Sequence, residues 1–300
     1  MPTLDVNEAN NAFHLLTLAS SFRPSSVAQM PPPAVPRYNV LGVGVSALTF
    51  EQARKLVVSV RGQTRLGYIC LGTAHGLTEA RSDDALRRIY NASWLTTPDG
   101  MPLVWLGPAG VERVYGPDLM LAVCDAGRAI GLTHYFYGGA PGVAETLRER
   151  LTARFPGLQV VGTTTPPFRP LELDEKAALR AEVARLRPDV IWVGISTPKQ
   201  ERFMAEFAPI LDAGVLIGVG AAFDFHSGRV RQAPRWIQRS GGEWLFRLCT
   251  EPRRLGPRYL KTNPLFVLHT LAQRTGLKKY PLEQGAARER AAKEQGPGNQ

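Results

Sequence analysis

The sequence predicts an α/β protein: a Rossmann-like, mainly parallel sheet with helices on both faces, followed by a C-terminal helical appendage. Short apolar runs alternate with amphipathic helical patterns from about residue 37 to residue 228. Parallel strands need crossover helices between them, so this alternation indicates a parallel sheet covered on both sides. Beyond about Phe225 the alternation stops, and prolines interrupt a stretch of helical spacing.

Seven short apolar runs are the expected strands. They are Asn39–Val45, Gly67–Leu71, Trp94–Thr97, His134–Tyr137, Leu158–Thr163, Asp189–Ile195 and Gly214–Val219. Helical spacing separates most of them, as where Val143, Leu147, Leu151 and Phe155 recur every fourth residue.

Composition divides the chain into four segments. Residues 1–36, which end in a proline-rich run, are expected to be a disordered leader, and the polar residues 280–300 a disordered tail. Between them we place the α/β domain at 37–228 and a basic helical appendage at 229–279. Because proline lacks the helical N–H donor, we expect the appendage to be cut into short helices at Pro234, Pro252, Pro257 and Pro264.

Positive charge is concentrated in the appendage. The chain has a formal net charge of +10, and residues 229–261 hold nine basic and two acidic side chains. Such a segment is either a solvated helical face or a surface for phosphates, whether of nucleic acid, anionic lipid or a nucleotide-sugar.

The cysteines and the apolar runs bear on where the protein works. Cys70, Cys124 and Cys249 lie far apart without disulfide or metal-ligand spacing, which fits a reducing cytoplasm. No signal-peptide pattern is found, and no apolar run approaches the roughly 20 residues that span a bilayer. Any membrane contact is therefore expected to be peripheral.

Polar residues follow two of the predicted strands in the first half of the domain. Asp99 comes directly after a strand, where α/β folds place catalysis; the alternative is a cap on a helix that starts near Met101. Thr73 and His75 follow an earlier strand and offer hydrogen bonds to a sugar or phosphate. His75 is either a base near neutral pH or a structural or solvated side chain.

Three further loops contain candidate ligand contacts. Gly138 and Gly139 allow backbone amides to approach a phosphate, although the loop fails the dinucleotide fingerprint GxGxxG. Lys199 and Gln200 open a helix and offer a cation and an amide, beside a Glu201 that suits a helix cap. Asp224, between two phenylalanines, is either a buried hydrogen-bond centre or a ligand contact.

No paired-carboxylate DxD motif appears, so no metal site and no cofactor are expected. A diphosphate would then need arginines, because guanidinium binds phosphate in a bidentate manner. The candidates are Arg113, Arg235, Arg239, Arg253 and Arg254.

Several motifs in a fixed order resemble those of one family, the WecG/TagA/CpsF glycosyltransferases (family 26). The similarity runs from about Tyr38 to about Leu260 and includes Pro98-Asp-Gly100, Glu112–Leu119, Gly138–Val143, Pro198–Glu201, Gly218–Phe225, Ala233–Trp236, Glu243–Arg247 and Glu251–Arg254. The resemblance implies transfer of a hexose or N-acetylhexosamine from a UDP-sugar to a polyprenyl-diphosphate-linked saccharide, in the synthesis of exopolysaccharide or another cell-surface polysaccharide.

The resemblance also implies roles for particular residues. Asp99 matches the proposed general base, and Thr73, Arg113, Gln200 and Asp224 match substrate- or nucleotide-binding positions. The family is taken to be inverting and independent of metal. Its appendage is thought to close over the site and touch the cytoplasmic face of the membrane, with arginines facing diphosphate; these would be Arg235, Arg239, Arg253, Arg254 and Arg258. Self-association of the chain is a further implication.

The donor sugar stays open, because many family members have Asn where this chain has His75. Both N-acetylmannosamine and glucose are candidates. The rival functions are a UDP-sugar-binding protein without catalysis, a nicotinamide oxidoreductase, and a nucleic-acid-binding protein that stacks bases on Trp236, Trp244 and Tyr259. Nucleic acid is not an expected partner, because no recognised binding module is present.

Overall fold

The computed structural model describes residues 35–282, apart from the side chain of Arg254. The predictions of a disordered leader and tail fall almost entirely outside the described residues. The helices and strands, in chain order, are β1 (Arg37–Val40), β2 (Val43–Ser46), α2 (Phe50–Val58), β3 (Tyr68–Gly72), α3 (Ala74–Ser82), α4 (Asp84–Ala92), β4 (Leu95–Pro98), α5 (Met101–Leu106), α6 (Gly116–Gly127), the 3-10 turn η1 (Arg128–Ile130), β5 (Thr133–Gly138), α7 (Val143–Arg154), β6 (Gln159–Thr164), α8 (Leu173–Leu186), β7 (Val190–Gly194), α9 (Lys199–Phe207), β8 (Val215–Gly218), α10 (Ala222–His226), α11 (Arg235–Arg239), α12 (Glu243–Thr250) and α13 (Pro252–Arg274).

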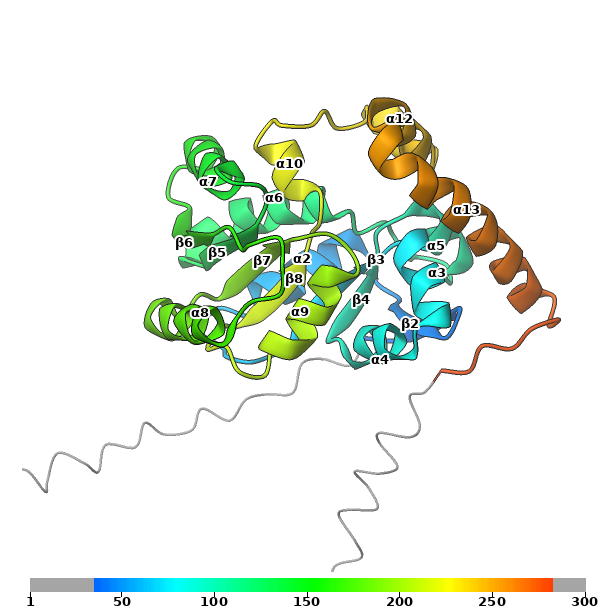
Figure 1. Cartoon of the computed structure of the whole chain (residues 1–300), viewed down its shortest axis with the longest axis horizontal. Helices are drawn as coiled ribbons and strands as arrows, with labels where there is room; N and C mark the ends of the chain where they lie inside the picture. The colour runs from blue at the N-terminus through cyan, green and yellow to red at the C-terminus, as the bar shows by residue number, and fades with distance from the viewer. Residues whose placement is uncertain (1–34, 283–300) are drawn as a thin grey trace, which may run out of the picture. The chain divides into compact units, whose positions relative to one another are not determined.

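Six parallel strands form the central sheet, in the order β4-β3-β8-β7-β5-β6. Six of the seven predicted strands lie in this sheet, and the predicted fold class is confirmed (Figure 1). The chain builds β3 and β4 at one edge and then crosses to β5 and β6 at the other. Strands β7 and β8 fill the middle, so the carboxyl ends of all six strands meet along one edge of the sheet.

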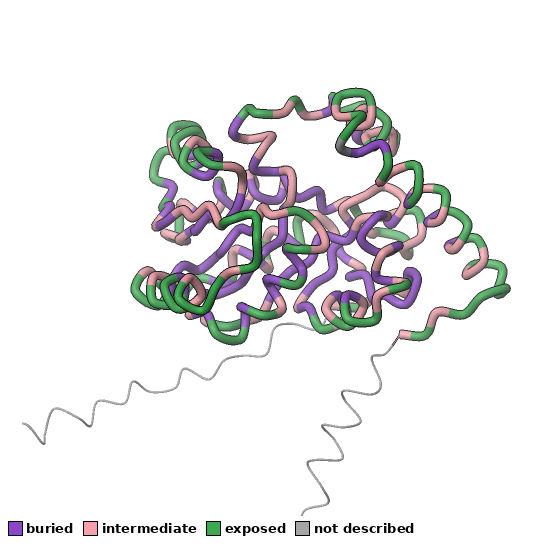
Figure 2. The backbone as a smooth tube through the Cα atoms, viewed as in Figure 1, coloured by how far each residue is buried: buried purple, intermediate pink, exposed green. Residues whose placement is uncertain are grey.

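Alternating side chains divide the core into two layers, one on each face of the sheet. In β3, Ile69 belongs to the layer formed with α2, α6 and α7, and Cys70 to the layer formed with α4, α8 and α9. In β7, Trp192 and Val193 alternate in the same way, and Trp192 is fully buried. Buried residues accordingly gather along the strands and on the sides of the helices that cover them (Figure 2). Strands buried on both faces read as continuous apolar runs, which made them recognisable in the sequence.

The prediction of one strand over Asn39–Val45 is wrong, because this segment is an antiparallel hairpin. Leu41 and Gly42 form its turn, with φ angles of 56° and 86°. Two-residue hairpin turns of this kind need positive φ at both positions, which Gly adopts without strain. The side chain of Asn39 also accepts a hydrogen bond from the Gly42 N–H, at 2.9 Å, and so stabilises the turn.

The C-terminal appendage consists of α11, α12 and α13. The expectation that prolines cut it into short helices is wrong for Pro257 and Pro264, which both lie inside the 23-residue helix α13. An interior proline costs roughly 3 kcal/mol. Burial of Leu255 and Phe266 offsets this cost, since α13 packs along α3 and Phe266 joins the core. Among residues 35–282, no helix combines the length and apolar character needed to cross a membrane.

Candidate active site

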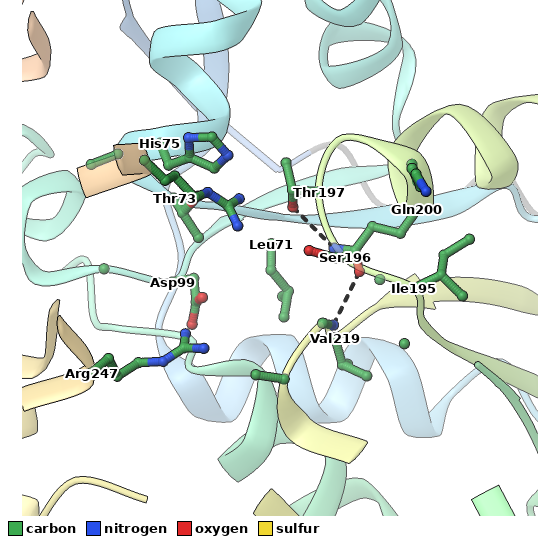
Figure 3. A pocket seen from close by; sticks show the side chains of 18 of the residues that line it. Leu71, Thr73, His75, Asp99, Ile195, Ser196, Thr197, Gln200, Val219 and Arg247 are labelled. Atoms are coloured by element: carbon green, nitrogen blue, oxygen red, sulfur yellow. Dashed lines mark hydrogen bonds between the residues drawn. The ribbon is translucent and has the colours of Figure 1, made fainter. Parts of the chain in front are cut away.

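A cavity of about 1830 Å³ lies at the carboxyl ends of the parallel strands. Its floor includes Leu71 and Asp99 at the ends of β3 and β4, and Val219 after β8 (Figure 3). The appendage contributes Arg247 from α12 and Arg258 from α13. Open α/β sheets bind ligands at this position, because the strand order reverses there and loops diverge to leave a crevice.

Most of the predicted site residues line this one cavity, although they come from seven different loops and helices. They are Thr73, His75, Asp99, Arg113, Gly139, Lys199, Gln200, Asp224 and Arg258. Gly138, Arg235, Arg239 and Arg253 do not line it. The side chain of Arg254 lies outside the described part of the structure.

Asp99 follows β4 and is half-buried at the cavity floor. It does not cap α5, whose N-cap is Gly100 without any side-chain hydrogen bond. Its Oδ1 instead accepts a hydrogen bond from the Gly116 N–H in the first turn of α6, at 3.2 Å. Burial raises the pKa of Asp99 to about 6; the positive charge of Arg113 opposes this shift, and the negative charge of Glu243 adds to it. A carboxyl group with such a pKa is a competent general base near neutral pH.

Arg113 connects the sheet to the appendage. Its Nη2 lies 2.5 Å from Oε2 of Glu243 in α12, and its Nε donates to the main-chain oxygen of Asp99. The guanidinium stacks on Tyr115 with 4.0 Å to the ring centroid, and the Tyr115 hydroxyl donates to the other Glu243 oxygen at 2.7 Å. Its Nη1 also donates to the main-chain oxygen of Gln238 at 3.3 Å, so four neighbours hold Arg113 in place.

Arg247 is a cavity residue to which the sequence reasoning assigned no role. It lies beside Asp99 in Figure 3, its side chain is 20% exposed, and its guanidinium carbon is 5.5 Å from the Phe225 ring centroid. Glu243 and Arg247 are separated by one helical turn, which places both on the same side of α12. This four-residue spacing was the signal in the sequence that could have identified Arg247, because it directs an acidic and a basic side chain toward a common partner.

Gln200 is 3% exposed, and both ends of its amide contact the protein. Its Oε1 accepts from the Gly220 N–H at 3.1 Å, and its Nε2 donates to Oε1 of Glu201 at 3.1 Å. Glu201 is fully buried and also accepts from Thr197 at 3.0 Å and Tyr90 at 3.3 Å. Burial raises the pKa of Glu201. This hydrogen-bond network, and not only a helix-capping role, accounts for a glutamate at position 201. Nothing in the sequence indicated that Tyr90 takes part in it.

Thr73 and His75 lie on the same side of the cavity as Asp99 (Figure 3). Thr73 is the N-cap of α3, and its hydroxyl accepts from the Gly76 N–H at 3.0 Å. His75 is 8% exposed, with Nε2 3.4 Å from Oε1 of Glu79. Burial, helped by the charge of Arg258, lowers the pKa of His75 to about 3. The imidazole is therefore neutral at physiological pH and a weak base.

The glycine loop after β5 has a packing requirement. A Cβ on Gly138 would lie 2.6 Å from the Gly194 oxygen at the end of β7, and the Gly138 φ of 133° disfavours other residues. The Gly139 N–H donates to the same oxygen at 3.0 Å, so this amide is not directed at a phosphate.

Asp224, by contrast, lines the cavity, and its carboxylate has no hydrogen-bond partner within residues 35–282.

The remaining predicted cations differ in position. Lys199 lies at the cavity with its ammonium 4.0 Å from the Phe168 ring centroid. Arg235 pairs with Asp118 at 2.8 Å outside the cavity, and Arg239 and Arg253 are exposed. No group of three or more His, Cys, Asp or Glu residues suited to a metal occurs in the part of the chain that is described.

Comparison with known proteins agrees with this geometry. Residues 38–280 match the sequence model of the glycosyl transferase WecG/TagA/CpsF family. A relative from Bacillus spizizenii, named N-acetylglucosaminyldiphosphoundecaprenol N-acetyl-beta-D-mannosaminyltransferase, is 27% identical over 180 residues, which cover 59% of this chain and 68% of the relative. The family resemblance read from the motifs is confirmed. The chain is a glycosyltransferase and belongs to the glycosyl transferase WecG/TagA/CpsF family.

Proposed function

We propose that this glycosyltransferase moves a sugar from a UDP-sugar to a saccharide carried on polyprenyl diphosphate, with inversion at the anomeric carbon and without a metal. The observation that carries the proposal is the position of Asp99. Its carboxyl group, with a pKa raised to about 6, lies in a large cavity beside Arg113 and Arg247. The name of the Bacillus spizizenii relative supports the acceptor class, since that protein acts on an undecaprenol-diphosphate-linked sugar.

In the proposed reaction a hydroxyl oxygen of the acceptor sugar attacks the anomeric carbon of the donor. Asp99 takes the hydroxyl proton, the new C–O bond forms, and the bond between the anomeric carbon and UDP breaks with its electron pair on the diphosphate. Attack from the face opposite the leaving group inverts the configuration. A base has to reach the hydroxyl directly or through one water, and the position of Asp99 in the cavity lining supports this role.

The leaving diphosphate gains negative charge and needs a cation or oriented N–H groups. Arg247 and Arg258 line the cavity and supply guanidinium groups. Arg113, which already pairs with Glu243, holds Asp99 and orients α12. We assign the diphosphate to Arg247 first, because it lies beside Asp99 and so near the reacting carbon.

The acceptor is attached to a lipid, so the protein has to meet a membrane surface. Exposed apolar side chains on the appendage support this step: Trp236 is 72% exposed and Leu260 73%. Arg239 and Arg253 are exposed on the same appendage and suit anionic lipid headgroups. We propose peripheral binding at the cytoplasmic face.

The test is a panel of UDP-sugars, including UDP-N-acetylmannosamine and UDP-glucose, offered with N-acetylglucosaminyl-diphospho-undecaprenol in detergent. UDP release and product mass are measured, with and without EDTA. We expect one donor to give turnover that EDTA does not reduce. UDP binding without turnover on any donor would favour a non-catalytic UDP-sugar-binding protein instead. Loss of turnover in EDTA, restored by a divalent cation, would refute metal independence.

A further inference from the structure

Phe168 is the most exposed of the large apolar side chains in the described residues, at 96%. It lies on the loop 165–171 between β6 and α8, and its ring contributes to the wall of the cavity. Pro166, Pro167 and Pro170 flank it and restrict the backbone of the loop. An aromatic ring held in water by a stiffened loop at a cavity wall is suited to bind a flat partner.

A cation lies directly against this ring. The ammonium of Lys199, the first residue of α9, is 4.0 Å from the Phe168 ring centroid, and Lys199 is itself exposed and lines the cavity. The neighbouring Arg169 is committed elsewhere, because its guanidinium makes two hydrogen bonds to Glu175, at 2.7 and 2.9 Å. Lys176 and Arg202 also line the cavity but pair with Glu206 and Asp83, each at 2.5 Å, so Lys199 is the cation beside Phe168 that we consider for a phosphate.

The Phe168 loop and Asp99 follow the two edge strands of the sheet and line the same cavity. Asp99 follows β4, one edge strand, and the loop follows β6, the other edge strand. The loop folds back from its edge, however, because the Phe168 ring contacts Lys199, which opens α9 just after β7. Strand β7 is three positions from β4 in the sheet, so roughly 14 Å separate this contact from Asp99, a span that suits a nucleotide-sugar. A nucleotide-sugar is elongated, with the reacting sugar at one end and the nucleobase at the other. If the sugar reaches Asp99, the base lies toward the Phe168 end.

We propose that Phe168 is the stacking surface for the nucleobase of the donor and that Lys199 binds a phosphate of the same nucleotide. This inference rests on the proposed function, in which the donor is a nucleoside-diphosphate sugar. The base lies on the ring face that Lys199 leaves open, and the ribose joins it to the phosphates on the Lys199 side. Stacking is tolerant of base identity, so Phe168 gives affinity for a nucleotide, while the choice of uracil depends on hydrogen bonds.

Isothermal titration of the full chain with UDP, and separately with inorganic pyrophosphate, tests this assignment. Phe168→Ala is expected to raise the Kd for UDP by about 10- to 100-fold, the range that loss of one stacked base gives. Phe168→Ala should leave the Kd for pyrophosphate unchanged. Phe168→Tyr keeps the stacking ring, so its Kd for UDP should stay within about 3-fold of that of the original chain. Lys199→Met weakens both UDP and pyrophosphate. Leu173→Ala is the matched control, since Leu173 is 87% exposed in the next helix and does not line the cavity.

Two outcomes would overturn the assignment while leaving the proposed function intact. One is UDP binding by Phe168→Ala that equals that of the original chain. The other is an equal loss of UDP and pyrophosphate affinity in Phe168→Ala, which would mean that the ring only supports the loop. If the unmodified chain itself binds pyrophosphate but not UDP, the proposed donor class fails, and the stacking assignment fails with it.

Discussion

Arg113 and Glu243 are 130 residues apart in the chain and 2.5 Å apart in space. Arg113 belongs to the segment that leads into α6, and Glu243 is the first residue of α12. Both partners are largely buried, with side chains 17% and 13% exposed, so this ion pair is more costly to break than a surface pair. It fixes the appendage against the sheet at the point where Asp99 lies.

Glu243→Gln should move the pH dependence of the reaction. The charge of Glu243 raises the pKa of Asp99, and its removal also frees Arg113 to stabilise the ionised carboxylate. Both effects lower the pKa of Asp99, so the rising limb of kcat/KM against pH should shift to lower pH. The control is Glu149→Gln, an exposed acid on α7. If the rising limb of the kcat/KM profile does not move, Glu243 has no influence on the titration of Asp99.

Asp99→Asn should abolish most turnover and leave UDP binding largely intact. Amide nitrogen cannot accept the hydroxyl proton, and general bases typically contribute about 10²- to 10⁴-fold to the rate. The measurement is UDP release under saturating donor and acceptor, alongside the Kd for UDP. Turnover within a few-fold of the original chain would remove Asp99 from the role of base.

The same substitution should stabilise the fold at high pH. The folded pKa of Asp99 is about 6, above its ordinary value of 3.8, so the folded state binds this proton more tightly than the unfolded state. Stability is therefore lost as pH rises from about 4 to about 6, and the ionised group costs about 3 kcal/mol above that range. Urea unfolding should show Asp99→Asn more stable at pH 8, with the gain disappearing near pH 4. If Asp99→Asn were equally stabilising at pH 4 and pH 8, ionisation of Asp99 would not be the cause of the added stability.

Glu201→Ala should destabilise the α/β domain by about 2–4 kcal/mol, since it leaves a cavity and removes the acceptor for Tyr90, Thr197 and Gln200. Glu201→Gln keeps the side-chain volume and one acceptor oxygen, so it should cost less. Denaturant unfolding of the two variants measures the difference. Equal losses would mean that volume, not hydrogen bonding, is what Glu201 supplies.

Vesicle binding should depend on the exposed apolar side chains of the appendage. Trp236→Ala combined with Leu260→Ala should reduce co-sedimentation with anionic vesicles by several-fold without lowering the melting temperature, because both side chains are more than 70% exposed. Leu173→Ala serves as the control for loss of an exposed leucine elsewhere. Substitution is a cleaner test than truncation near Gly228, which would also remove the core residue Phe266. Unchanged co-sedimentation would argue against this docking face.

Sequence reasoning was most successful where short-range patterns carry the information. The six sheet strands are continuous apolar runs because both faces are buried, and polar residues such as Asp99 follow them at the edge where ligand sites form. The hairpin at Leu41 and Gly42 was missed because its two strands are only four residues each and read as one run. Helix α13 was divided wrongly because packing of Phe266 outweighs the local preference of Pro264.

The contacts around the cavity were the part of the site that could not be predicted from the sequence. Arg247 and Glu243 were visible as a motif, but their position beside Asp99 depends on how α12 folds back onto the sheet. Tyr90 contributes to the Gln200 network from a helix 111 residues before Glu201. Such contacts follow from tertiary packing, and no local spacing in the sequence encodes them.

The order of synthesis gives the appendage a further consequence. A ribosome makes Asp99 well before it makes Glu243 and Arg247, so a nascent chain without α12 contains Asp99 and Arg113 but lacks Arg247 and the Glu243 partner of Arg113. Such a chain keeps Arg113 beside Asp99 but lacks Arg247, to which the proposed function assigns the leaving diphosphate. If the proposed function holds, the site is complete only after α12 has been made, and a nonsense mutation before Glu243 should yield a protein without transferase activity.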